Sequence, residues 1–364
     1  MVNSFTNQNV EKWWRWIFRK SDDLPAATIY FLSRRYSTSP RFLPLYDNTQ
    51  QVRIILFRGS RIPKMDFLLL LLLEPFVYIF KNKLASYSIF ITFKLRSNLI
   101  VPTNNLLNID DPSYTTQELN SILNWERQVQ DYGFSTHIVC TTAYIQTYLV
   151  TNGVNSKILV IPQGHSILKS KENIGEKVFN RVKKIAYASP YIDYLGDHHA
   201  MHPMWGAQFF IDKIIPQLLL IDNIELHIIG RIGMNAEPML DDPRIVKYGL
   251  RSIKECSEIL QNCDLALYPR VSDNRWQPQK IIEYLGAELP VVAFDLVDTE
   301  IVTKLGIGFV AKNPKEFIQQ VSLLCEDVSI LEKLRMNCKK EAPNFSWSNL
   351  GQKFDEYLLD NSIL

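Results

Sequence analysis

Apolar and polar positions alternate in short blocks along the C-terminal half of this chain. Compact apolar runs end at glycine, proline or charged residues, as buried strands do, and amphipathic stretches separate them. The expected strands are 184–189, 224–229, 245–248, 264–269, 290–294 and 308–311. The expected helices are 205–220, 253–260, 278–285, 300–305, 314–325, 330–340 and 346–359. Strands and helices that alternate with tight loops predict a parallel sheet covered on both faces.

The N-terminal half has a less regular pattern of the same α/β kind. Its expected strands are 27–33, 52–57, 87–93, 98–101, 137–141 and 157–162, and its expected helices are 117–130 and 143–150. The polar stretch 169–177 has no apolar period, which is typical of a linker. A chain of 364 residues also exceeds the size of one ordinary core. We therefore expect two α/β domains, residues 1–165 and 178–343, with a cleft between them.

Composition narrows the class of protein. Hydrophobic residues make up 46% of the chain and charged residues 21%, which suits a globular protein with a sizeable core. Only 14 residues are glycine, and neither a G-x-G-x-x-G nor a P-loop pattern occurs. The 5 cysteines form no C-x-x-C pair, so we interpret them as reduced thiols of a cytoplasmic protein. The N-terminus lacks the apolar core of a secretory signal.

The first 100 residues differ from the rest in charge. They hold 15 Lys/Arg against 6 Asp/Glu, whereas the remaining residues hold 25 against 32. Within them, residues 13–20 mix tryptophan with basic side chains, and the apolar run 67–80 is shorter than the roughly 20 residues a spanning helix needs. We predict peripheral contact with the inner face of a membrane, with burial of both stretches as the alternative. The basic residues are scattered, which argues against a nucleic-acid partner.

The stretch 262–295 holds the densest candidate chemistry. A strand runs into a polar loop, and a helix begins near Pro278, so free helical amides and the positive end of the helix dipole would attract an anion. Lys280 and Glu283 are three residues apart and share one helix face. Lys280 would add a charge to the anion site, and Glu283 could accept two hydrogen bonds from a ribose diol. A surface ion pair between the two is the alternative.

At this point the sequence resembles a known family. Residues 278–293, PQKIIEYLGAELPVVA, resemble the donor-binding pattern P-x-K-x-x-E-[YF]-[LM]-A-x-G-x-P-V-[VI]-[AG] of group 1 glycosyltransferases with the GT-B fold. Residues 157–164, KILVIPQG, resemble the segment that ends their N-terminal domain, and residues 224–230, IELHIIG, resemble a strand of their donor domain. The resemblance covers about residues 134–340. It implies two facing Rossmann-like domains and a last helix, 346–360, that crosses back to the N-terminal domain.

The resemblance implies transfer of a sugar from a nucleotide-sugar donor to a glycan or lipid-linked acceptor. The candidate donor-binding residues are Glu283, Lys280, Gln279, Arg275, Arg270, Arg231 and His199. Arg275 stands where many retaining members have a glutamate, and residues 189–205 lack the usual basic pair. These departures leave the stereochemistry open. A nucleotide-sugar epimerase of the same fold and a non-catalytic glycosyltransferase-like binding protein are the alternatives.

Three residues are candidates for the chemistry itself. Asp110 or Asp111 would deprotonate the acceptor hydroxyl, although Asp-Asp-Pro is also a common turn. Lys280 and the helix dipole would stabilise the leaving diphosphate in place of a metal, since no D-x-D motif precedes the site. The histidines of residues 198–202 lack the glutamate of an H-E-x-x-H site. We expect no metal and no cofactor, with the nucleotide sugar as a substrate.

Overall fold

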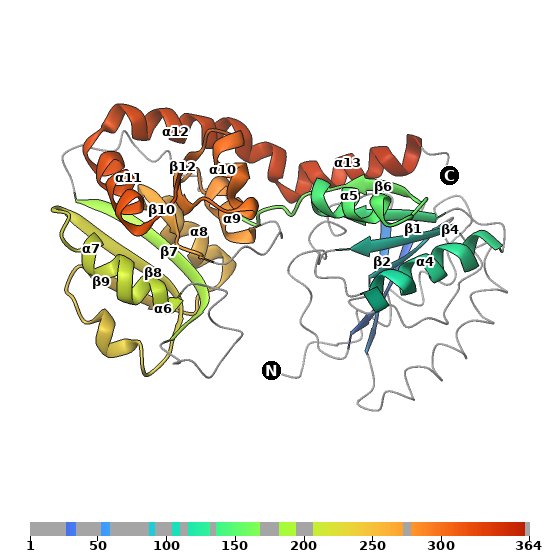
Figure 1. Cartoon of the computed structure of the whole chain (residues 1–364), viewed down its shortest axis with the longest axis horizontal. Helices are drawn as coiled ribbons and strands as arrows, with labels where there is room; N and C mark the ends of the chain where they lie inside the picture. The colour runs from blue at the N-terminus through green and yellow to red at the C-terminus, as the bar shows by residue number, and fades with distance from the viewer. Residues whose placement is uncertain are drawn as a thin grey trace. The chain divides into compact units, whose positions relative to one another are not determined.

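The computed structural model describes residues 27–33, 52–58, 87–91, 104–109, 116–131, 136–167, 182–193, 207–271 and 278–360. The chain forms two compact units (Figure 1). Unit 1 comprises Met1–Ile161 together with Gly351–Leu364, and unit 2 comprises Pro162–Leu350. Each unit contains one six-stranded sheet, and the described strand pairs of both sheets are parallel. The predicted α/β class with parallel sheets is confirmed.

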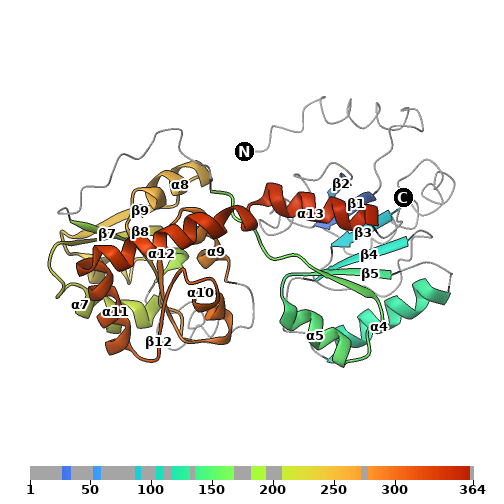
Figure 2. The same ribbon diagram turned by 90° about the horizontal axis from the view of Figure 1, so that it is seen from above.

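The sheet of unit 1 has the order β2-β1-β3-β4-β5-β6. Its strands are β1 (Ala27–Ser33), β2 (Val52–Arg58), β3 (Tyr87–Ile91), β4 (Asn104–Ile109), β5 (Thr136–Cys140) and β6 (Lys157–Val160), and its helices are α4 (Thr116–Asp131) and α5 (Ala143–Thr151). Ile138 and Cys140 of β5 join the core of these two helices. Because strand side chains alternate between faces, His137 points to the other face, where it contacts Tyr357 of α13 (Trp347–Asp360). Figure 2 shows α13 on the side of this sheet opposite α4 and α5.

The sheet of unit 2 has the order β12-β11-β10-β7-β8-β9. Its strands are β7 (Lys183–Ile192), β8 (Ile224–Ile232), β9 (Ile245–Gly249), β10 (Leu265–Tyr268), β11 (Val291–Phe294) and β12 (Gly308–Ala311). Its helices are α6 (Ala207–Phe209), α7 (Ile215–Leu218), α8 (Ile253–Gln261), α9 (Gln279–Gly286), α10 (Glu300–Lys304), α11 (Pro314–Glu326) and α12 (Val328–Glu341). Within the described ranges, none of the helices is long and apolar enough to cross a membrane.

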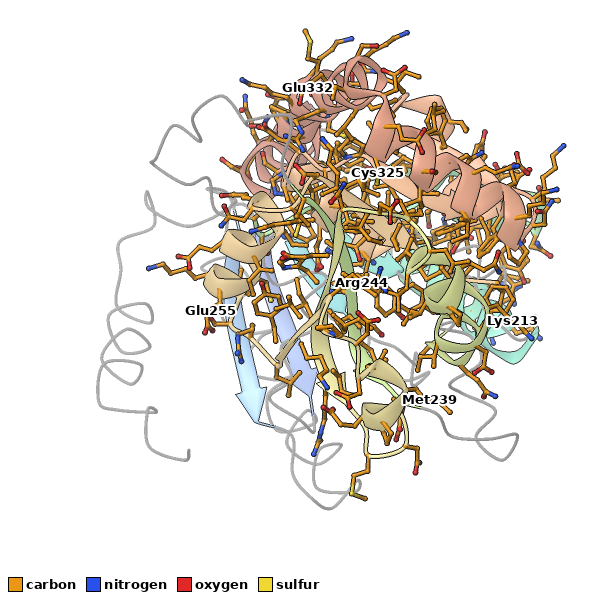
Figure 3. All side chains as sticks on the ribbon, turned by 90° about the vertical axis from the view of Figure 1, so that its left-hand side faces the viewer. Lys213, Met239, Arg244, Glu255, Cys325 and Glu332 are labelled. Atoms are coloured by element: carbon orange, nitrogen blue, oxygen red, sulfur yellow. The ribbon has the colours of Figure 1, made fainter. Side chains whose placement is uncertain are left out.

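Helices cover both faces of the unit 2 sheet. On one face, Leu226 and Leu267 pack with residues of α7 and α11, including Leu218 and Phe317. On the other, Ala266 and its neighbours pack with residues of α8, α9 and α10. Figure 3 shows this division, because Glu255 of α8 and Lys213 lie on opposite sides of the strands. Burial on both faces explains the continuous apolar runs that the sequence shows at β10 and β11.

The expected helix 205–220 is interrupted by a π-helical turn over Phe210–Ile214, between α6 and α7. In this turn the amide of Ile215 donates to the carbonyl of Phe210, five residues back. Pro216 explains the irregularity, since its ring has no N–H and crowds the carbonyl four residues before it. The stretches 98–101 and 169–177, expected as a strand and a linker, lie outside the described residues.

β8 continues past the glycine at which we expected it to end. Gly230 lies inside the strand with φ +140°, and a Cβ there would be 1.7 Å from the carbonyl oxygen of Ser189. The position therefore needs glycine. β4, Asn104–Ile109, lies where the residue pattern predicts no strand.

Candidate functional site

The strand order of unit 2 reverses between β7 and β10. From this pair, the chain builds the sheet outward through β8 and β9 on one side and through β11 and β12 on the other. Such a reversal is where ligands bind in open parallel sheets, outside the carboxyl ends of the strands. β7 and β10 pair only at Ile185–Leu265 and Ala186–Ala266, and β7 then continues without β10 to Ile192. The two strands therefore separate at their carboxyl ends.

A buried tyrosine occupies the place where the two strands separate. The hydroxyl oxygen of Tyr284 on α9 accepts a hydrogen bond of 2.8 Å from the amide of Ala188 on β7. Burial raises the pKa of Tyr284 well above its usual value, so the phenol stays neutral. The bond fixes α9 against β7, next to the carboxyl end of the sheet.

Arg270 lies two residues after the end of β10, at the same edge of the sheet. Its side chain is only 9% exposed. Nη1 donates a hydrogen bond of 3.2 Å to the hydroxyl of Tyr268 and lies 3.6 Å from Oδ2 of Asp298. Among the described residues, Nε and Nη2 have no hydrogen-bond partner. A buried guanidinium with unsatisfied donors is costly unless a ligand completes it, and guanidinium groups match phosphate geometry.

Lys280 and Glu283 lie on the partly exposed face of α9. Nζ of Lys280 donates to Oε2 of Glu283 over 2.7 Å, and the two side chains are 32% and 27% exposed. Pro278 caps the helix in an extended conformation and provides no side-chain acceptor for the first amides. The short helix α9 thus carries the Glu283 carboxylate and the Lys280 ammonium group close to its own N-terminus.

Gln279 has a partner within unit 2. Its Nε2 donates to the carbonyl oxygen of Gly164 over 2.9 Å, so only its amide oxygen is left as a candidate ligand for a donor. Arg231 lies exposed on β8 beside Tyr191 of β7, on the side of β7 away from β10. The structure therefore brings Arg270 and the α9 residues to the strand reversal and places Arg231 one strand further along.

Four predicted site residues lie outside the described residues: Asp110, Asp111, His199 and Arg275. Their roles stay predictions. Across the described ranges, no group of three or more His, Cys, Asp or Glu side chains could hold a metal ion.

Sequence reasoning did not single out Asp298, Tyr268 or Tyr284. Asp298 lies in the turn after β11, and its side chain is fully buried against Arg270. Asp298 could have been noticed from its position in the sequence, because it comes shortly after an expected strand whose carboxyl end lies at the ligand-binding edge of the sheet.

Comparison with known proteins agrees with this geometry. Residues 189–327 match the family model "Glycosyl transferases group 1". Over this segment of unit 2, the chain is similar to the group 1 glycosyltransferases. The match runs from the last residues of β7 through α11 and contains Arg270, Lys280 and Glu283. No curated protein sequence matches the chain.

Solved structures of glycosyltransferases share the fold. HepE from Anabaena, in complex with UDP-glucose, has a TM-score of 0.60 and 13% identity, with 92% of this chain and 99% of that chain covered. WaaG, a glycosyltransferase involved in lipopolysaccharide biosynthesis, has a TM-score of 0.56 and 13% identity, with 91% and 99% covered. A variant of TarM from S. aureus has a TM-score of 0.53 and 14% identity, with 76% of this chain covered, and the chain spans 57% of that protein's length. The predicted GT-B fold is confirmed.

Proposed function

We propose that this glycosyltransferase moves a sugar from a nucleotide-sugar donor whose diphosphate binds Arg270 at the strand reversal of unit 2. The observation that carries the proposal is the buried guanidinium at the carboxyl end of β10, whose Nε and Nη2 have no hydrogen-bond partner among the described residues. Two adjacent N–H groups suit a bidentate contact with phosphate oxygens. In support, the solved HepE structure holds UDP-glucose and the TarM structure holds UDP.

α9 would complete the donor site. Lys280 would contact the diphosphate and Glu283 the ribose diol. The present pair between them is partly exposed, and such pairs contribute only about 0.2–1 kcal/mol, so a donor can rearrange it at little cost. The amide oxygen of Gln279, together with Arg275, Arg231 and His199, would supply the remaining donor contacts.

In the reaction, the bond between the sugar's anomeric carbon and the diphosphate oxygen breaks, and a bond to the acceptor oxygen forms. The leaving diphosphate takes the bonding electron pair, and Arg270, Lys280 and the start of α9 would stabilise its charge. Asp110 or Asp111 would take the proton of the acceptor hydroxyl. We propose that this chemistry proceeds without a metal or cofactor. Activity that EDTA removes and a divalent ion restores would contradict this part.

We propose a glycan or lipid-linked acceptor bound by unit 1, at the cytoplasmic face of a membrane. In support, WaaG takes part in lipopolysaccharide biosynthesis, and the TarM complex contains alpha-GlcNAc-glycerol. The basic excess of the first 100 residues would favour an anionic surface.

Thermal unfolding with a nucleotide panel tests the donor site. UDP, GDP and ADP, each with its nucleoside monophosphate and its glucose conjugate, are added to the full chain. A ligand at 100 times its dissociation constant adds about 2.7 kcal/mol to the free energy of unfolding, which shifts Tm by several degrees. We expect at least one diphosphate to stabilise wild type more than its monophosphate does.

Arg270→Gln should lose most of that shift. Arg251→Gln is the matched control, because Arg251 is exposed at the start of α8 and pairs with Glu255 at 3.9 Å. The same shift in Arg270→Gln as in wild type would contradict the assignment of Arg270.

A further inference from the structure

The positive charge of Arg270 is balanced in part by a buried carboxylate, that of Asp298. Asp298 lies in the short helical turn Val297–Thr299 after β11, and its carboxylate is 0% exposed. Oδ2 lies 3.6 Å from Nη1 of Arg270, which makes the two an ion pair without a close hydrogen bond. The turn is fixed by Thr299, whose Oγ1 donates to the carbonyl oxygen of Phe294 over 2.6 Å and accepts from the amide of Leu296.

The third member of the cluster is neutral. Burial raises the pKa of Tyr268 to about 12, so its phenol accepts a hydrogen bond from Nη1 without adding charge. Asp298 is therefore the counter-charge of the guanidinium. It approaches Nη1, whereas Nε and Nη2 are the atoms without a partner among the described residues. Asp298 thus reduces the positive potential at the two free donors without occupying them.

This arrangement bears on turnover. Opposite charges interact strongly where water is largely excluded, so an uncompensated buried cation would bind a nucleoside diphosphate more tightly. The diphosphate is also a product, and release of product limits the rate of many enzymes. A carboxylate beside the guanidinium weakens the hold on the product as well as on the donor.

We propose that Asp298 is a positioning residue with a tuning role: its carboxylate lowers the affinity of Arg270 for the leaving nucleoside diphosphate and so speeds product release. The inference rests on the proposed function, since it takes Arg270 as the diphosphate-binding group. A merely structural carboxylate would, on replacement, lower stability and weaken ligand binding. A counter-charge would, on replacement, tighten it.

Asp298→Asn in the full chain tests the proposal, because it removes the charge and keeps the shape. Calorimetry with inorganic pyrophosphate and with the best-binding nucleoside diphosphate measures the dissociation constant. We expect both probes to bind about tenfold more tightly than to wild type, which corresponds to about 1.4 kcal/mol. In steady-state transfer, kcat and the donor KM should fall together, and the product should inhibit more strongly.

Two comparisons make the result specific. Asp295→Asn is the matched control, since Asp295 is an exposed carboxylate of the same loop, and it should leave both dissociation constants unchanged. In the Arg270→Gln background, Asp298→Asn should lose most of its tightening effect, because the cation that the carboxylate compensates is gone.

Wild-type chain that binds neither pyrophosphate nor any nucleoside diphosphate would overturn the proposed function, and this inference with it. If wild type binds and Arg270→Gln weakens binding, equal or weaker affinity in Asp298→Asn overturns the tuning role alone. Loss of the folded state in Asp298→Asn and also in Asp298→Ser, followed by circular dichroism, would likewise overturn it, since the carboxylate would then be a structural requirement.

Discussion

Arg270 and Lys280 differ in how firmly the protein holds them. The guanidinium is nearly buried and is contacted from two other positions, Tyr268 and Asp298. The ammonium group is about one third exposed and is held by Glu283 of its own helix. A helical pair at i,i+3 contributes only about 0.2–0.5 kcal/mol. Arg270 is thus oriented before a ligand arrives, whereas Lys280 and Glu283 can adjust to it.

Replacement of Glu283 tests the proposed contact between its carboxylate and the ribose diol. We expect Glu283→Ala to abolish transfer and to weaken nucleoside diphosphate binding about 10- to 100-fold, because charge-assisted hydrogen bonds contribute about 1.5–3 kcal/mol. Calorimetry with the ribonucleotide and with its 2′-deoxy form tests whether Glu283 binds the ribose diol. Glu283→Ala should weaken binding of the deoxy form less than binding of the ribonucleotide.

Glu258→Ala is the matched control for Glu283→Ala. Glu258 is a more exposed carboxylate on α8 and pairs with Lys254 at 3.9 Å. Its loss should change neither affinity nor transfer. Unchanged nucleotide affinity in Glu283→Ala would remove Glu283 from the site.

At the residue scale, local spacing predicted what lies within one helix. Lys280 and Glu283 are three apart, so their neighbourhood follows from the helical period. The Arg270–Asp298 pair joins loops that are separated by a strand and a helix, and no local pattern encodes which loops meet. The bond between Gln279 and Gly164 was not predictable from local spacing, because it depends on packing between distant segments. The donor contact expected of Gln279 stays a prediction.

Packing of α9 against an aromatic ring gives a test at the scale of elements. A Cβ at Gly286 would be 2.4 Å from Cγ of His165, and Nε2 of His165 is 3.1 Å from the carbonyl oxygen of Ala342. We expect Gly286→Ala to cost about 1–3 kcal/mol in the free energy of unfolding, measured in urea. In the His165→Ala background the same change should cost little. An equal cost in both backgrounds would show that the ring is not the obstacle.

The contact between β5 and α13 should depend on pH. Burial, and then the nearby charge of Lys157, lower the pKa of His137 to about 4, against about 6.5 in the unfolded chain. Between these values the unfolded state binds more protons, so stability falls as the pH drops through this window. We expect protonation of His137 to lower the free energy of unfolding by about 2–3 kcal/mol across this pH window.

Urea unfolding from pH 7 to pH 4 measures this slope. His227, whose pKa burial also lowers, contributes to the wild-type slope, so the relevant quantity is the difference between wild type and His137→Gln. The variant should have the shallower slope. Parallel slopes would contradict a protonation-sensitive contact at β5.

Helices and strands were predictable from the sequence where their apolar residues follow a regular pattern. The runs at β10, β11 and β12 are apolar throughout because both faces of the sheet are covered. β4, with the sequence NNLLNI, was missed because asparagine is uncommon in strands. The π-helical turn was missed because it is a single turn, and the apolar positions on either side of it still have helical spacing.

At the scale of the molecule, the spacing of apolar residues does not predict the order of strands in a sheet. A period predicts that a segment is a strand, but the reversal between β7 and β10 depends on where each crossover packs. The architecture was reached from the sequence through its resemblance to a family, whose model matches residues 189–327.

Charge asymmetry leads to a test of membrane contact. We expect the full chain to sediment with anionic vesicles and less with neutral ones, because each basic residue near an anionic leaflet contributes roughly 1 kcal/mol. Salt should weaken the attraction. Trp13→Ala combined with Trp14→Ala should weaken it further, whereas Tyr144→Ala, at an exposed aromatic of α5, should not. Negligible sedimentation with both vesicle types at low salt would rule the contact out.

Unit 1 is made from two stretches of chain that are far apart in sequence, Met1–Ile161 and Gly351–Leu364. During synthesis, unit 2 is continuous and can fold as soon as its last residue leaves the ribosome. Unit 1 must wait for Phe354, which is 0% exposed, and for Tyr357, the partner of His137. The half of the protein that is made first is therefore finished last. Chains that are truncated after residue 350 and released from the ribosome should resist protease over unit 2 and be cut within unit 1.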